Sequence, residues 1–113
     1  MAATGKGEGT LACLPSPFSP DGDGMDDATV IRYVLPPGRW SLSVDIYDVR
    51  GRRIRRLAAA MPGEGQGEII WDGRDDMQGK GRIGLYAVVM EAWDPASGAR
   101  VRARGVVVLA GRL

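Results

Sequence analysis

The sequence predicts an all-β fold of about seven short antiparallel strands, and three observations support this prediction. Apolar and polar residues alternate over Trp40–Tyr47, which is the period of a strand with one buried face. The chain holds 17 Gly and 7 Pro among 113 residues, so turn formers interrupt it often. Its hydrophobic content of 44% is ordinary, so the glycines separate elements of a folded chain. A sandwich of two sheets fits this pattern best.

One domain is expected over residues 10–113, preceded by a polar, Gly-rich flexible leader at residues 1–9. A chain of 113 residues is long enough to bury a single core. Its 15 basic and 14 acidic residues leave a net charge of +1, which argues against nucleic-acid binding. No apolar run approaches the roughly 18 residues of a membrane-spanning helix, so membrane insertion is not expected.

The N-terminal half of the domain should contain three strands separated by proline-rich or acidic segments. In chain order we expect a strand at Leu11–Leu14, an extended connector at 15–20, an acidic loop at 21–27, a strand at Ala28–Leu35, a Pro-Pro-Gly break at 36–38 and a strand at Trp40–Tyr47. The connector cannot join a sheet ladder because its prolines have no amide to donate. In the last strand, Trp40, Leu42, Val44 and Ile46 share the buried face.

The C-terminal half should add four strands. In chain order we expect a turn at 48–51, a strand at Arg52–Ala59, a Gly-rich loop at Met61–Gly67, a short strand at Glu68–Trp71, a loop from Asp72 to Gly84, a strand at Leu85–Trp93, a turn at 94–98 and a strand at Arg100–Leu109. Trp40 and Trp71 are expected in the core, Phe18 as a plug at the sandwich end, and Trp93 half exposed. Seven strands at this spacing predict an Ig-like β-sandwich.

Three segments carry further motifs, in the order Ser16–Asp27, Val44–Leu57 and Trp71–Tyr86. They resemble, in turn, an "NPFSPDGDG-x-x-D" opening, a "V-x-I-Y-D-x-x-G-R-x-V-R-x-L" hairpin and a "WDGRDD…G-x-Y" loop. Together they are similar to the Ig-like domain of the flagellar hook-capping protein and to the C-terminal sorting domains of type IX secretion cargo. The resemblance runs from about Leu14 to Leu113. Two departures are Ser16, where Asn is common, and Met25, where an aromatic or β-branched residue is usual.

This resemblance implies a non-catalytic C-terminal module of a secreted bacterial surface protein, carried behind an upstream cargo domain. Such a module passes through the periplasm to the outer cell surface, and secretion and attachment machinery proteins recognise it as a sorting signal. The recognition residues would lie in the last strand and the basic tail, at Val106, Val107, Val108, Leu109 and Arg112. The alternative is a structural or assembly module: a spacer, an adhesin repeat or a polymerising subunit.

The acidic loop predicts a candidate Ca²⁺ site that would stabilise the module. Asp21, Asp23, Asp26 and Asp27 place four carboxylates within seven residues, and Met25 adds a backbone carbonyl. Calcium prefers six to eight oxygen ligands of this kind, although the spacing departs from an EF-hand. The alternative is that these residues form Asx turns, for which Asp-Gly pairs are well suited.

Clustered arginines predict a surface for an anionic partner. The candidates are Arg53, Arg55, Arg100, Arg102 and Arg104, of which the last three share one strand face. An anionic surface polysaccharide or an acidic receptor would suit guanidinium groups. The alternative is that these charges maintain solubility and protect sheet edges from pairing with other chains.

An enzyme is not expected. The chain has no histidine and a single cysteine, Cys13, which is expected in a buried strand. Its carboxylates fall in turns, where solvent keeps their pKa values near normal. No environment would then hold one carboxyl group protonated as the acid while another stays ionised as the base.

Overall fold

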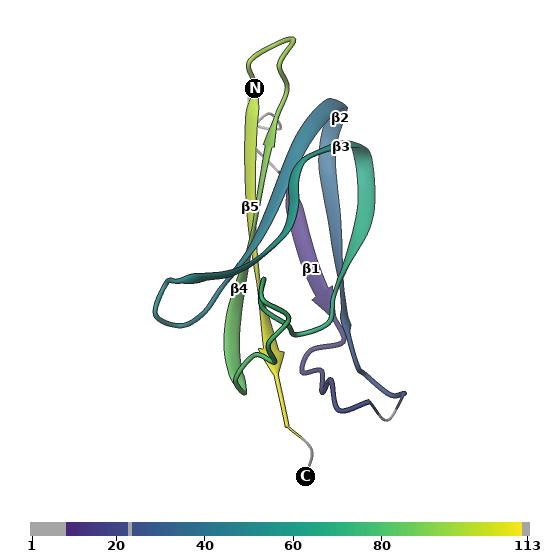
Figure 1. Ribbon diagram of the computed structural model, residues 1–113. Coiled ribbons are helices and arrows are strands. Elements are labelled where there is room, and N and C mark those ends of the chain that lie inside the picture. The colour runs from purple at the N-terminus through teal and green to yellow at the C-terminus, as the bar shows by residue number, and fades with distance from the viewer. Residues whose placement is uncertain (1–8, 23, 112–113) are drawn as a thin grey trace.

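The computed structural model describes residues 9–22 and 24–111, and these form one antiparallel sheet of five strands (Figure 1). The strands are β1 (Thr10–Leu14), β2 (Thr29–Tyr47), β3 (Arg53–Trp71), β4 (Gly84–Trp93) and β5 (Arg100–Leu109). The order is β1-β2-β4-β5, and β3 also pairs with β2. The described residues include no helix of the length and apolarity needed to span a membrane. The expected leader lies outside them, except for Gly9.

The sheet curls on itself because β2 changes partners along its length. β1 pairs with residues 30–34 of β2, whereas β4 pairs with residues 41–47. Between these two segments β2 and β3 arch over together, at the top of Figure 1. The two halves of the sheet therefore face each other across one core, as in an Ig-like β-sandwich. The all-β prediction is confirmed.

The strand count differs from the expected seven because the arch does not interrupt either strand. The expected strands at 28–35 and 40–47 are both part of β2. At the Pro-Pro-Gly segment the register shifts, and residues 35–38 of β2 lie opposite the single residue Gly65 of β3. Prolines lack the amide that regular pairing needs, so the chain bends there. Gly65 has a φ of 58°, and the Trp40 indole donates to the Pro36 carbonyl at 2.9 Å.

The loop predicted at Met61–Gly67 is wrong, because these residues belong to β3. The glycines there serve close packing as well as turning. A Cβ at Gly63 would lie 2.8 Å from the Leu42 side chain, and one at Gly67 would collide with the Tyr33 hydroxyl. Glycine therefore allows β3 to lie against large side chains of β2.

The core predictions are confirmed at the aromatic residues. Trp71 is 0% exposed and packs edge-on against Phe18 and Tyr86, with ring centroids 5.5 and 5.2 Å away. Its indole also donates to the Arg74 carbonyl at 2.9 Å. Trp40 is likewise buried, whereas Trp93 is 42% exposed. The three rings that pack together are those of Phe18, Trp71 and Tyr86. They come from the connector after β1, the end of β3 and the start of β4, so they join distant parts of the chain.

The proline-rich connector closes the sandwich by binding the end of β5. The Phe18 amide donates to the Val108 carbonyl at 3.0 Å, and the Ala110 amide donates to the Phe18 carbonyl at 2.8 Å. The Ser16 hydroxyl accepts from the Val108 amide at 3.1 Å. The connector directly follows β1, so these bonds tie the end of β5 to the end of β1.

We predict that Trp71→Ala lowers the free energy of unfolding by about 3–5 kcal/mol, because it leaves a cavity between Phe18 and Tyr86. Trp71→Phe keeps a ring, loses the hydrogen bond to Arg74, and should cost less. Chemical denaturation measures both values. The matched control is Trp93→Ala, which should cost about 1 kcal/mol or less because this indole is half exposed. Equal losses in Trp71→Ala and Trp93→Ala would contradict the role given to Trp71.

Candidate functional site

The acidic loop forms a compact turn around the Asp27 carboxylate. The two oxygens of Asp27 accept the amides of Gly22 and Gly24 at 3.0 and 2.8 Å. The Ser19 amide donates to the Asp26 carbonyl at 2.7 Å. These bonds run from Asp27 back to earlier residues, so they differ from an Asx turn, in which the carboxylate accepts the amide two residues further on. Asp23 lies outside the described residues, and within the described ones no three potential metal-ligating side chains gather. Calcium binding at this loop stays a prediction.

The structure brings the two acidic segments of the sequence together. Asp27 from the first and Asp72 from the second both line a hollow of about 200 Å³. Two basic residues, Arg74 and Lys80, line the same hollow. The Arg74 amide donates to the Asp72 carboxylate at 3.0 Å, so this second turn also uses a carboxylate to hold its own backbone.

The expected recognition strand is partly core and partly surface. Val107 and Leu109 are buried, whereas Val106 is 55% exposed. Val108 is half-buried, and its backbone is bound to the proline-rich connector. β5 stands last in the strand order, so it is an edge strand of the sheet. Arg112 lies outside the described residues.

The expected arginine surface is divided between two edges of the sheet. Arg53 and Arg55 lie on β3, and two strands, β2 and β4, separate them from the arginines of β5. Arg100, Arg102 and Arg104 are exposed, in register with Trp93, Glu91 and Val89 of β4. The Arg100 guanidinium lies 5.6 Å from the centre of the Trp93 ring, within the range of a cation–π contact.

On β3, Arg55 holds a loop in place. Its guanidinium contacts the Asp72 carboxylate at 3.5 Å and donates to the carbonyls of Arg74 and Asp75 at 3.1 and 3.4 Å. These contacts fix the loop after β3 against the start of the same strand. Arg55 is therefore committed within the fold, while Arg53 is exposed.

The neighbouring Arg56 explains why Asp45 is buried, which the sequence did not predict. Asp45 lies on the polar side of the predicted strand, yet it is only 4% exposed. Two atoms of the Arg56 guanidinium reach its carboxylate at 2.8 and 3.1 Å, and this contact raises the pKa of Arg56. A paired guanidinium satisfies the carboxylate, so burial does not leave it without a partner.

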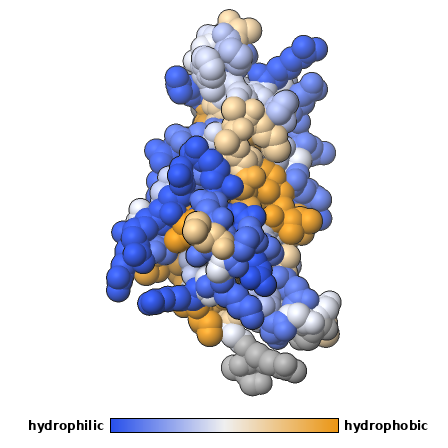
Figure 2. Space-filling model, in the orientation of Figure 1, coloured by the Kyte–Doolittle hydropathy of each residue, from blue (hydrophilic) through white to orange (hydrophobic). Residues whose placement is uncertain are grey.

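A groove that the sequence analysis missed lies between the β2–β3 turn and the loop before β4. This basic groove has a volume of about 340 Å³ and is lined by residues of the segments 48–54 and 75–86. Four basic side chains line it, from Arg50, Arg52, Lys80 and Arg82. Figure 2 shows hydrophilic side chains around the β2–β3 turn, at the left of the molecule. Local sequence motifs did not predict the groove, because its two walls come from segments that are far apart in the sequence.

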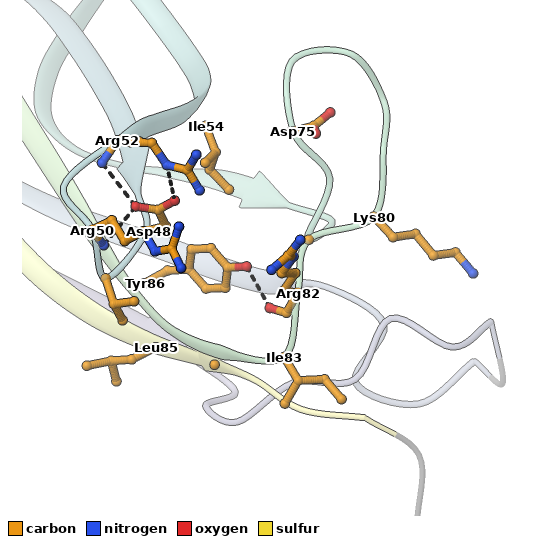
Figure 3. A pocket seen from close by; sticks show the side chains of 13 residues that line it. Asp48, Arg50, Arg52, Ile54, Asp75, Lys80, Arg82, Ile83, Leu85 and Tyr86 are labelled. Carbon is orange, nitrogen blue, oxygen red and sulfur yellow. Dashed lines mark hydrogen bonds and ion pairs between the residues drawn. The ribbon is translucent and has the colours of Figure 1, made fainter.

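Hydrogen bonds fix both walls of the basic groove. Asp48 accepts the amides of Arg50 and Arg52 at 2.9 and 3.0 Å, and its second oxygen binds the Arg52 guanidinium at 3.1 Å. These bonds, chiefly that from the Arg52 amide, lower the pKa of Asp48. On the other wall, the Tyr86 hydroxyl donates to the Arg82 carbonyl at 2.6 Å. Figure 3 shows the Tyr86 ring between the Asp48–Arg52 pair and Arg82.

No arrangement among the described residues suggests a nucleophile with a base. Cys13 is buried, and desolvation raises the pKa of its thiol to about 11. The thiolate needed for nucleophilic chemistry is therefore scarce at neutral pH. The described surface presents an edge strand, an exposed arginine row on β5 (Arg100, Arg102 and Arg104) and a basic groove.

This fold and surface define an Ig-like β-sandwich module. The family model for the FlgD Ig-like domain matches residues 19–96, and the chain belongs to that family. No curated protein matches the chain significantly.

Among solved structures, the chain is similar to part of dimeric latent PorU from Porphyromonas gingivalis, with a TM-score of 0.68 and 18% identity. The match covers 92% of this chain and 9% of the PorU chain. The likeness thus concerns the fold of a small part of a much longer protein. The Ig-like fold inferred from the three sequence motifs is confirmed.

We predict that the Asp48 carboxylate stabilises the fold at neutral pH and not in acid. Its pKa is lower in the folded protein, so the contribution is present above the ordinary value of 3.8 and is lost as pH falls through the folded value. Asp48→Asn, which resembles the protonated acid, should lower the melting temperature at pH 7, and this effect should shrink progressively as the pH falls below 3.8. The control Glu64→Gln should leave the melting temperature unchanged over the same pH range. A loss for Asp48→Asn that stays equal over this range would contradict this reasoning.

Proposed function

We propose that the chain is a non-catalytic sorting and attachment module of a secreted bacterial surface protein, exported by type IX secretion. The proposal rests on its resemblance to sorting domains and on membership of the FlgD Ig-like domain family. The match to only 9% of a much longer chain fits a small module attached to larger cargo. The site of action would be the outer cell surface.

The observation that carries the proposal is the position of β5. It is an edge strand, and its end is bound to the connector near Ser16 and Phe18. Its exposed Val106 therefore belongs to a strand that is held in place before any partner arrives. A fixed edge strand with an outward apolar side chain suits recognition by a protein of the secretion machinery.

An anionic surface polysaccharide is the attachment partner that we propose for the arginine row of β5. Arg102 and Arg104 form no ion pair among the described residues, and Arg100 lies over the half-exposed Trp93. Guanidinium groups bind carboxylates and phosphates, while an indole ring offers a flat apolar surface for a sugar ring.

The second candidate is a structural or assembly module, and the long edge of β3 favours it. β3 has 19 residues and pairs with β2 alone. Such an edge can accept a strand from a neighbouring copy, although Pro62 and the charges along β3 oppose that pairing. Concentration-dependent oligomers in size-exclusion chromatography with light scattering would support this candidate over the first.

The export proposal predicts that residues 10–113 carry a reporter to the cell surface. They would be fused behind a signal peptide and a folded fluorescent protein in a host with type IX secretion. Surface exposure, measured by protease shaving, should disappear in a secretion mutant. Retention of the folded fusion in the periplasm would contradict the proposal and favour the structural module.

Two matched variants test the role of β5. Val106→Asp should reduce surface exposure of the reporter without a loss of melting temperature, because this side chain is exposed. Ile70→Asp changes another exposed apolar residue, on β3, and should leave export unchanged. Equal export of both variants would contradict recognition through Val106.

A further inference from the structure

We propose that the basic groove is a docking site for an acidic peptide segment of a partner protein. The groove lies between the β2–β3 turn and the loop before β4, away from the arginine row of β5. This role is independent of export, so failure of either proposal leaves the other standing.

The charge of the groove is the first argument. Arg52 is neutralised by Asp48, whereas the side chains of Arg50, Lys80 and Arg82 form no ion pair among the described residues. The other acidic residue of the groove, Asp75, uses one carboxylate oxygen to accept the amides of Met77 and Gly79 at 2.9 and 2.8 Å. Like charges held around one hollow repel each other, so a ligand with carboxylates lowers their energy.

The apolar side chains of the groove are the second argument. Ile83 is 70% exposed, and Val49 and Leu85 are also exposed. All three line the groove together with the basic residues. A polysaccharide or an inorganic anion would satisfy the charges and leave these side chains in water. A peptide that combines acidic and aliphatic residues would satisfy the charges and bury the apolar surface as well.

The rigidity of the groove is the third argument. The Asp48 carboxylate holds the turn of one wall, and the Tyr86 hydroxyl holds Arg82 on the other (Figure 3). The Gly81 amide donates to the Gly73 carbonyl at 2.8 Å, which fixes the loop between them. Because the backbone of both walls is already ordered, the groove itself loses little conformational entropy when a ligand binds.

Several lining residues of the basic groove lie at positions that the sequence motifs leave unspecified. Val49 and Arg50 occupy the two unspecified positions of the "Y-D-x-x-G-R" motif, and Lys80, Arg82 and Ile83 lie in the variable stretch of the "WDGRDD…G-x-Y" loop. The defined motif positions, such as Asp48 and Tyr86, build the frame. Apart from Arg52, which is a defined motif position, the basic and apolar lining of the groove is therefore not specified by the motifs.

The test uses a fluorescein-labelled peptide of repeating Asp-Leu-Glu-Val, titrated with the protein and followed by fluorescence anisotropy. We expect saturable binding that weakens as salt is added. The double variant Arg50→Glu/Arg82→Glu should weaken it by about tenfold or more. The control Arg39→Glu/Arg53→Glu makes the same change of charge at two exposed arginines outside the groove and outside the arginine row of β5, and it should weaken binding by less than about twofold. Melting temperatures establish that all variants are folded.

The apolar contribution has its own test. Ile83→Ser should weaken binding of the Asp-Leu-Glu-Val peptide by about threefold or more, and leave binding of an all-Glu peptide unchanged. Three results would overturn the proposal. They are no peptide binding up to about 1 mM, equal losses in the groove and control variants, or binding of polygalacturonate through Arg50 and Arg82 with none of the peptide.

Discussion

The packing of Phe18 and Tyr86 against Trp71 is the constraint on which the rest of the structure depends. Trp71 is completely buried, and its neighbours come from two other parts of the chain. Phe18 belongs to the connector that binds the end of β5, and Tyr86 lies near the start of β4, which pairs with both β2 and β5. A sheet that curls on itself needs such a contact, because its ladder hydrogen bonds alone leave the two halves free to separate.

Two of the three sequence motifs supply these rings: Phe18 lies in the first motif, and Trp71 and Tyr86 both lie in the third. The hairpin motif joins the same end of the molecule through Arg55, which binds the loop after Trp71. Residues of all three motifs therefore make the contacts that close one end of the sandwich. The family and the fold are shown by the comparisons, whereas the proposed docking site depends on residues between the defined motif positions, such as Arg50, Lys80 and Ile83.

The sequence predicted correctly those features that depend on the local alternation of apolar and polar residues. The alternation at Trp40–Tyr47 identified a half-buried strand, and the tryptophans were assigned correctly to core and surface. Composition failed at Met61–Gly67, where glycines suggested a loop but instead make room for Leu42 and Tyr33 in the facing strand. The burial of Asp45 and the separation of the arginines depend on which strands become neighbours. The basic groove depends on the same strand pairing, and no short segment of the sequence shows which strands become neighbours.

The last strand contributes to stability and carries the proposed recognition residues, and these two roles fall on different side chains of β5. Val107 and Leu109 fill the core, and the backbone of Val108 holds the connector. Deleting the strand would therefore unfold the sandwich and abolish any function that needs a folded domain. Only side chains that point outward, such as Val106, can be changed while the fold persists. A role in recognition is consequently a statement about the exposed residues of β5, and truncation alone cannot establish it.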